Sequence, residues 1–175
     1  MRNWLMLGFG VLIIGLLNFG VVQKERVVTN GDQVFLKLRP VDPRSLLQGD
    51  YMRLGFDVEE KARPFIKEAN LRSGNLIVQV DENLVGDYRK LDDGSALADN
   101  EYGVHFTNVS WQPTLVPNSF FFQEGEADKF AQAKFAVLVF GADRRDYVLA
   151  GLANESRELI NPRAALGMEL PAFLQ

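Results

Sequence analysis

The chain of 175 residues has no cysteine and a single histidine, His105. Without cysteine there is no disulfide, no thiolate nucleophile and no metal site with cysteine ligands. One histidine cannot build a histidine-rich metal site, and a spacing of the HExxH type is impossible. The glycines stand singly, so the sequence has no glycine-rich phosphate loop. We therefore expect neither a metal ion nor a cofactor.

The sequence also lacks an excess of positive charge. Lysine and arginine total 19, aspartate and glutamate total 23, and the formal net charge is −4 at pH 7. Nucleic acids and anionic lipid surfaces are bound through basic patches. The acidic balance therefore argues against a nucleic-acid partner.

The usual signatures of serine hydrolases are absent. No Gly-x-Ser-x-Gly elbow surrounds a serine, and His105 falls on the more polar face of its predicted strand, which predicts a surface histidine. A signal-peptidase-like hydrolase needs a serine followed by methionine and a buried lysine base. No serine here is followed by methionine, and Lys134 is the only lysine that enters a strongly apolar run. We expect the chain not to be an enzyme, and a Ser/Lys hydrolase is our third hypothesis.

One long hydrophobic run is present, from Trp4 to Val22, and it contains no charged side chain. A helix of about nineteen residues reaches roughly 28 Å, close to the hydrocarbon thickness of a bilayer. We predict that residues 1–23 form an uncleaved transmembrane anchor in the lipid bilayer. A cleaved signal peptide and a buried core helix are the alternatives. The run is longer than a typical signal segment and lacks the polar stripe of a core helix.

The flanks of this run predict its orientation. A short N-terminal flank usually stays cytoplasmic, and long domains are translocated largely regardless of their charge. We therefore predict a single-pass protein of the inner (cytoplasmic) membrane, with a cytoplasmic N-terminus and a periplasmic domain. Within the run, Gly8 and Gly15 share a helix face with Asn18 nearby, a pattern suited to packing against a partner helix.

The pattern of residues 24–160 predicts one extracytoplasmic domain, followed by an apolar tail over 161–175. Apolar residues alternate with polar ones in many short segments, which indicates strands. The predicted strands cover residues 33–39, 51–58, 76–80, 102–106, 135–140 and 147–152. Residues 135–140 are apolar on both faces and predict a central strand, with 147–152 as its hairpin partner.

Signals for helices are few. Residues 126–134 have helical spacing with acidic residues first, and residues 59–71 could hold a second helix that Pro64 splits. The fold class is therefore mainly β (β-rich α+β), a single N-terminal transmembrane helix followed by one antiparallel β-rich domain with one or two short helices.

Residues 40–56 read PVDPRSLLQGDYMRLGF and resemble the signature of the bacterial GDYXXLXY family. The matching residues are Gly49, Asp50, Tyr51 and Leu54, and Phe56 replaces the final tyrosine. Other family-like positions are Asp42 and Arg44, an aromatic segment with Phe120, Phe121, Phe122, Glu124 and Gly125, and residues 148–152. The resemblance spans roughly residues 34–153. It implies a small membrane-anchored protein, of a kind often encoded beside or fused to multi-pass membrane proteins, and it implies no catalytic residue.

The signature has two interpretations. Gly49 and Asp50 suit a tight turn, and Asp50 then needs a basic partner such as Arg44 or Arg39. Alternatively, the loop from Asp42 to Tyr51 binds a partner or ligand. The three consecutive phenylalanines also have two interpretations. They form either a strand buried on both sides or an exposed ridge that docks to a membrane partner or bilayer.

Three functional hypotheses follow. The first is a membrane-anchored, extracytoplasmic accessory subunit that associates with a multi-pass membrane protein. The alternative is a membrane-tethered domain that binds a small ligand or cell-envelope component through the Asp42–Tyr51 loop. The third is the hydrolase described above.

Overall fold

A computed structural model of the chain describes residues 9, 12–15, 18, 31–39, 51–122 and 125–160. Most of the predicted anchor and all of the tail 161–175 lie outside these residues. Among the residues that are described, no helix has the length and apolar character needed to cross a membrane.

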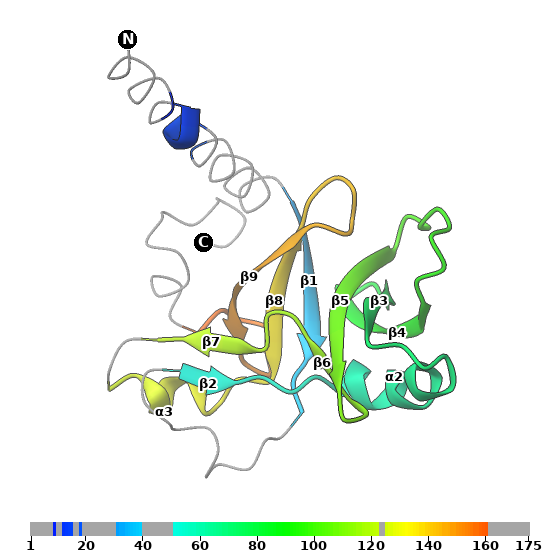
Figure 1. Cartoon of the computed structure of the whole chain (residues 1–175). Coiled ribbons are helices and arrows are strands. Elements are labelled where there is room, and N and C mark those ends of the chain that lie inside the picture. Colours follow the sequence, from blue (N-terminus) through cyan, green and yellow to red (C-terminus); the bar gives the residue numbers. More distant parts are fainter. Residues whose placement is uncertain are drawn as a thin grey trace.

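Most of the described elements are strands (Figure 1). They are β1 (Asp32–Lys37), β2 (Tyr51–Arg53), α2 (Asp57–Glu68), β3 (Ser73–Val80), β4 (Val85–Leu91), β5 (Glu101–Val109), β6 (Gln112–Leu115), β7 (Ser119–Phe121), α3 (Ala127–Phe130), β8 (Phe135–Phe140) and β9 (Tyr147–Ala153). The prediction of a β-rich domain with short helices is confirmed.

Seven strands form one sheet in the order β6-β5-β3-β4-β1-β8-β9, while β2 and β7 form a separate two-stranded ribbon. The pairs are antiparallel except β1 and β4, which run parallel with Phe35 opposite Val85. The prediction of an antiparallel β-rich domain is thus confirmed in the main, with this one parallel pair as the exception. A parallel pair needs a long crossover, and here β2, α2 and β3 lie between its two strands in the sequence.

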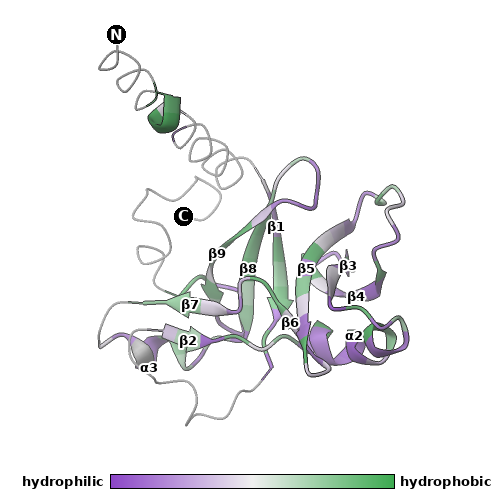
Figure 2. Ribbon diagram, viewed as in Figure 1, coloured by the Kyte–Doolittle hydropathy of each residue, from purple (hydrophilic) through white to green (hydrophobic). Residues whose placement is uncertain are grey.

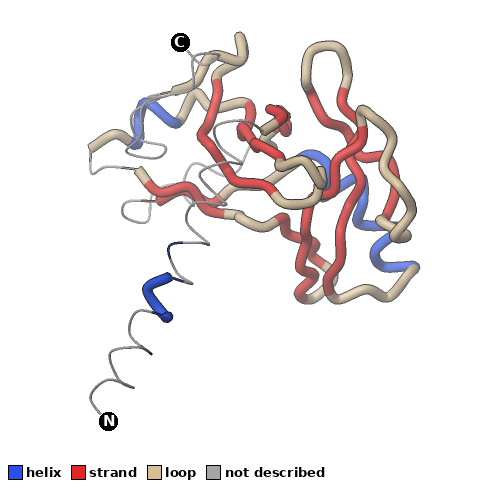
Figure 3. Tube along the Cα trace, turned by 90° about the horizontal axis from the view of Figure 1, so that it is seen from above, coloured by secondary structure: helices blue, strands red, loops and turns tan. Residues whose placement is uncertain are grey.

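The large sheet is curled, so that strands far apart in its order come together (Figure 3). The N–H of Gly103 on β5 donates to the carbonyl of Arg144 at 2.8 Å. The N–H of His105 donates to Oη of Tyr147, the first residue of β9, at 3.1 Å. These bonds join β5, the second strand of the order, to the β8–β9 turn and the start of β9, and we call this join the seam.

Alternation along the strands places the apolar side chains inside the curl. Val34, Leu36, Leu76 and Phe106 are all fully buried in the main core. Each such side chain contributes about 1.5–3 kcal/mol when it leaves water. The strands that carry them, especially β1 and β8, are the most hydrophobic ribbons in Figure 2.

Strand β8 is buried on both faces, as its sequence predicts. Leu138 and Phe140 point into the main core, whereas Val137 and Val139 pack with Phe35 in a second cluster. The predicted hairpin with β9 is also present, with Phe140 opposite Tyr147.

Helix α2 differs from the predicted helix over residues 59–71 in two ways. It begins at Asp57, so Val58 is buried in a helix and not in a strand. It also runs unbroken through Pro64 to Glu68. Pro64 lies on the exposed face, where water can reach the carbonyl that lost its partner, while Ala62 and Ile66 are buried beneath.

The second predicted helix, over 126–134, is much shorter than expected. Only Ala127–Phe130 is helical. The N–H of Lys134 donates to the carbonyl of Ala153, and the carbonyl of Lys134 accepts from Leu38, both at 2.8 Å. These sheet-like bonds end the helical conformation early. Figures 1 and 3 place α3 and α2 at opposite sides of the molecule.

Candidate interaction site

The signature and the aromatic segment, far apart in sequence, meet in the β2–β7 ribbon. Tyr51 lies opposite Phe121, and Met52 lies opposite Phe120. Because opposite residues of an antiparallel pair share a face, Met52 and Phe120 lie on one face of the ribbon, and Tyr51 and Phe121 lie on the other.

The inner face of the ribbon belongs to the core. Met52 is 8 % exposed and Phe120 is 6 % exposed. The ring of Phe130 on α3 packs between Phe120 and Phe122, with centroids at 5.2 and 5.3 Å. These contacts hold the ribbon firmly on the domain.

The outer face carries Tyr51, Arg53, Ser119 and Phe121, and we call these four side chains the ridge. Phe121 is 71 % exposed, and the centroid of its ring lies 5.7 Å from that of Tyr51. The three phenylalanines therefore divide, because Phe120 and Phe122 are buried and Phe121 is exposed, while docking through Phe121 stays a prediction.

The end of the signature is structural. Leu54 is 5 % exposed and Phe56 is 1 % exposed. Phe56 forms an isolated bridge with Leu38 just beyond β1. A tyrosine hydroxyl at position 56 would need a buried hydrogen-bond partner, which explains why phenylalanine fits this interior.

Glu59 follows the signature directly and was missed by our sequence analysis. It is the one charged residue that is buried in the described part of the chain, with 2 % of its surface exposed. Its Oε2 accepts the N–H of Phe56 at 3.1 Å, and its Oε1 accepts the N–H of Leu115 on β6 at 2.8 Å. Burial raises the pKa of Glu59, against the opposing effect of these two N–H groups.

Two arginines compensate the acidic start of α2. Arg39, after β1, contacts the carboxylates of both Glu59, at 3.4 Å, and Glu60. Arg63 reaches Glu60 at 2.7 Å. Arg39, one of the two predicted partners of Asp50, is engaged with these two glutamates, and Asp50 lies outside the described residues.

The bond from Leu115 to Glu59 closes the edge of the large sheet. The N–H of Val116 points toward β5, where it donates to the carbonyl of His105 at 3.0 Å. By alternation, the backbone nitrogens of Pro113 and Leu115 point outward. Proline has no N–H, and Glu59 accepts the other. Edge β6 is thus closed to further strands.

A second polar cluster lies along the seam. Arg145 binds Asp92 through Nε at 3.0 Å and Nη2 at 3.2 Å, and its stem covers Gly103, where a Cβ would approach Cγ to 2.9 Å. Hydrogen bonding to Arg145 lowers the pKa of Asp92. Burial raises the pKa of Tyr147, whose hydroxyl accepts the N–H of His105, to about 12.

The residues considered for catalysis lie apart. His105 is exposed, as predicted, and its Nδ1 lies 3.1 Å from Oδ1 of Asn75, an amide that does not titrate. Lys134 lies just before β8 rather than at a helix end. The described ranges contain no group of three histidine, aspartate or glutamate residues that could hold a metal ion.

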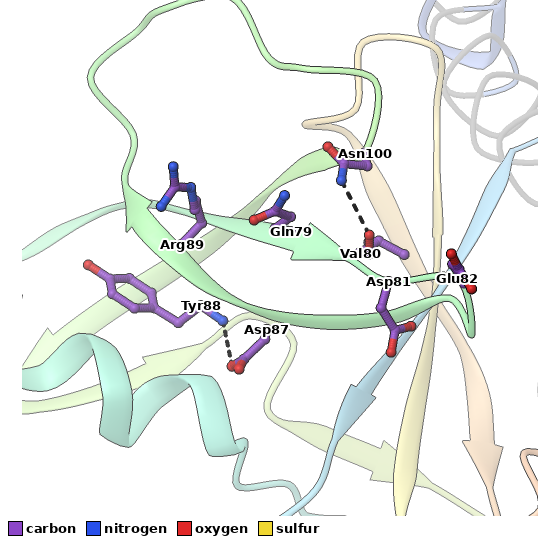
Figure 4. A pocket seen from close by; sticks show the side chains of 8 residues that line it. All are labelled: Gln79, Val80, Asp81, Glu82, Asp87, Tyr88, Arg89 and Asn100. Carbon is purple, nitrogen blue, oxygen red and sulfur yellow. Dashed lines mark hydrogen bonds between the residues drawn. The ribbon is translucent and has the colours of Figure 1, made fainter.

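A shallow hollow of about 570 Å³ opens beside the β3–β4 hairpin (Figure 4). Two of its lining carboxylates, Asp81 and Asp87, are already engaged. Asp81 accepts the N–H groups of Asn83 and Val85, both at 2.8 Å, and Asp87 pairs with Lys61 at 2.6 Å. These contacts support the hairpin and its packing on α2.

Several predicted site residues lie outside the described part of the chain: Asp42, Arg44, Gly49, Asp50, Glu124 and Gly8. Ligand binding through the Asp42–Tyr51 loop therefore stays a prediction. Gly125 has φ of 85°, a conformation that favours glycine. A Cβ at Gly15 would meet nothing within 4 Å, and Asn18 donates to the carbonyl of Ile14 at 2.8 Å.

Comparison with known families supports the motif analysis. A family model described as GDYXXLXY protein matches residues 13–145, which include the ribbon, Glu59 and part of the seam. This match confirms the resemblance inferred from the signature. No curated protein and no solved structure matches the chain.

Proposed function

Because the chain belongs to the GDYXXLXY protein family, we propose that it is a membrane-anchored accessory subunit. In this proposal residues 1–23 span the inner membrane, the domain lies in the periplasm, and the ridge binds a multi-pass membrane protein.

The exposure of Phe121 is the observation that carries the proposal. A phenylalanine that is 71 % exposed leaves a large apolar surface in water. It stands on a short ribbon fixed to the core and rests on Tyr51. Rigid aromatic side chains of this kind are frequent hot spots of protein interfaces, because little conformational entropy is lost on binding.

The anchor is supported by the charge-free run from Trp4 to Val22. Within it, the side chains of Phe9, Leu12, Ile13 and Ile14 are between 51 % and 67 % exposed. Such side chains favour a hydrocarbon environment by about 0.3–0.6 kcal/mol each.

Co-purification tests the proposal directly. The full-length protein, extracted from membranes in a mild detergent, should retain a multi-pass protein, and Phe121→Ala should reduce its yield at least tenfold. Trp111→Ala is the matched control, since Trp111 is also an exposed aromatic, 48 % accessible, at the β5–β6 turn. Equal yields from wild type and the Phe121 variant would contradict the role of the ridge.

Fractionation tests the anchor separately. The protein should stay in the membrane pellet after an alkaline wash, with its N-terminal methionine or second residue intact. Release into the supernatant, or a processed form that begins beyond residue 22, would contradict the anchor.

A further inference from the structure

The two edges of the ribbon have backbone groups that point outward. Leu54 donates to the carbonyl of Asn118 at 2.8 Å, so the pair of Leu54 and Asn118 is hydrogen-bonded. Bonded and non-bonded pairs alternate in an antiparallel ladder. The N–H and C=O groups of Tyr51 and Arg53 therefore point away from β7.

These outward groups have no main-chain partner among the described residues, where no hydrogen bond beyond the ribbon uses Tyr51 or Arg53. In Figure 1, β2 is the outer strand of the ribbon and β7 lies between it and β9. Within the described part of the chain, nothing pairs with the outer edge of β2, whereas Pro113 and Glu59 close edge β6. A ribbon of two three-residue strands also gains stability from a third strand.

The charge of the ribbon indicates what could bind there. Its six residues include Arg53 and no carboxylate, although the chain as a whole carries a net charge of −4. None of the ion pairs between described residues includes Arg53. A carboxylate placed against this guanidinium would form a charge-assisted bond.

Building on the proposed function, we propose that the outer edge of β2 takes an extended acidic segment of the partner as an added strand. Main-chain bonds to Tyr51 and Arg53 supply affinity that is independent of sequence. A carboxylate of the segment faces Arg53, and an apolar side chain lies against Tyr51 and Phe121. The segment belongs to a water-exposed part of the partner, because a carboxylate is costly in the hydrocarbon.

A synthetic peptide tests the site without knowledge of the partner. The full-length protein in detergent micelles should bind a labelled Glu-Val-Glu-Val-Glu-Val peptide at least tenfold more tightly than the matching Lys-Val peptide. Arg53→Glu should reverse this preference, and Arg53→Lys should preserve it. Equal binding of both peptides, or a preference unchanged in Arg53→Glu, would overturn the proposal.

Hydrogen exchange identifies the edge even if a variant folds poorly. In wild-type protein with the acidic peptide bound, the amides of Tyr51 and Arg53 should exchange at least tenfold more slowly. The amides of Ser119 and Phe121, on the opposite edge, should be unchanged. Protection confined to Ser119 and Phe121 would overturn the assignment to β2. If a multi-pass protein co-purifies through Phe121 but the peptide tests fail, the proposed function stands and the strand-addition site does not.

Discussion

Glu59 and Asp92 are two carboxylates that join distant parts of the chain, and they do so in opposite ways. Glu59 is buried and accepts two backbone N–H groups, one from β6. Asp92 has a side chain that is 9 % exposed and forms a bidentate pair with Arg145. Burial raises the pKa of Glu59, whereas hydrogen bonding to Arg145 lowers that of Asp92. The surroundings of a carboxylate, rather than the carboxylate itself, decide which protonation state the fold favours.

The largest expected effect is at Glu59. Glu59→Ala should lower the free energy of unfolding by about 3 kcal/mol, because the N–H groups of Phe56 and Leu115 both lose a buried acceptor. Glu59→Gln keeps one acceptor oxygen, so it should lower the free energy of unfolding by about half as much as Glu59→Ala. Urea denaturation of the purified protein measures both. An alanine variant as stable as wild type would show that water replaces the carboxylate at no cost.

At the seam, Asp92→Ala should lower the free energy of unfolding by about 2 kcal/mol, because it removes the bidentate partner of Arg145. A double-mutant cycle with Arg145→Ala isolates the pair from the contact that Arg145 makes over Gly103. We expect a coupling energy of about 1 kcal/mol. Strict additivity of the two substitutions would contradict a direct contribution of the pair.

The pH dependence should differ in sign between the two carboxylates. Glu59 has a raised pKa, so the folded state binds more protons, and stability from this group falls as pH rises from 4.5 through the raised pKa. Asp92 has a lowered pKa, so the unfolded state binds more protons. Its contribution to stability is complete above pH 3.8 and is lost as pH falls through the lowered pKa. Each slope is at most about 1.4 kcal/mol per pH unit. Denaturation curves between pH 3 and 8 should lose the first slope in Glu59→Gln and the second in Asp92→Asn.

An exposed ion pair should have the smallest effect on the free energy of unfolding. Lys61 and Asp87 lie 2.6 Å apart, but their side chains are 46 % and 62 % exposed. Solvent screens such a pair, so Lys61→Ala should change stability by less than about 0.5 kcal/mol. A loss above 1 kcal/mol, measured in the same urea titration, would show that this contact matters to the packing of α2 on the hairpin.

The sequence predicted the strands with clear apolar patterns and missed those without them. β1 and β8 are evident because Val34, Leu36 and residues 135–140 are apolar. β4 has only two apolar aliphatic residues, Val85 and Leu91, and β6 is short and contains Pro113. Both owe their conformation to pairing with neighbouring strands, which a local pattern does not contain.

The candidate site was predicted in its parts but not in its assembly. The signature and the phenylalanines were both singled out, yet only the fold brings Tyr51 opposite Phe121. Glu59 escaped notice because a capping box usually begins with serine or threonine, and here Phe56 stands in that position. Asp92 and Arg145 were separated by too much sequence for any local signal.

The position of β1 has a consequence for synthesis. Of the described strands this one comes first in the sequence, yet it lies between β4 and β8, with Phe35 opposite Val85 on one side and Val137 on the other. During synthesis β1 can pair with β4 once residues 85–91 have been made, but its other neighbour, β8, is made only near the end of the domain. One edge of β1 therefore stays unpaired until β8 is added, which makes closure of the sheet around β1 a late event in folding.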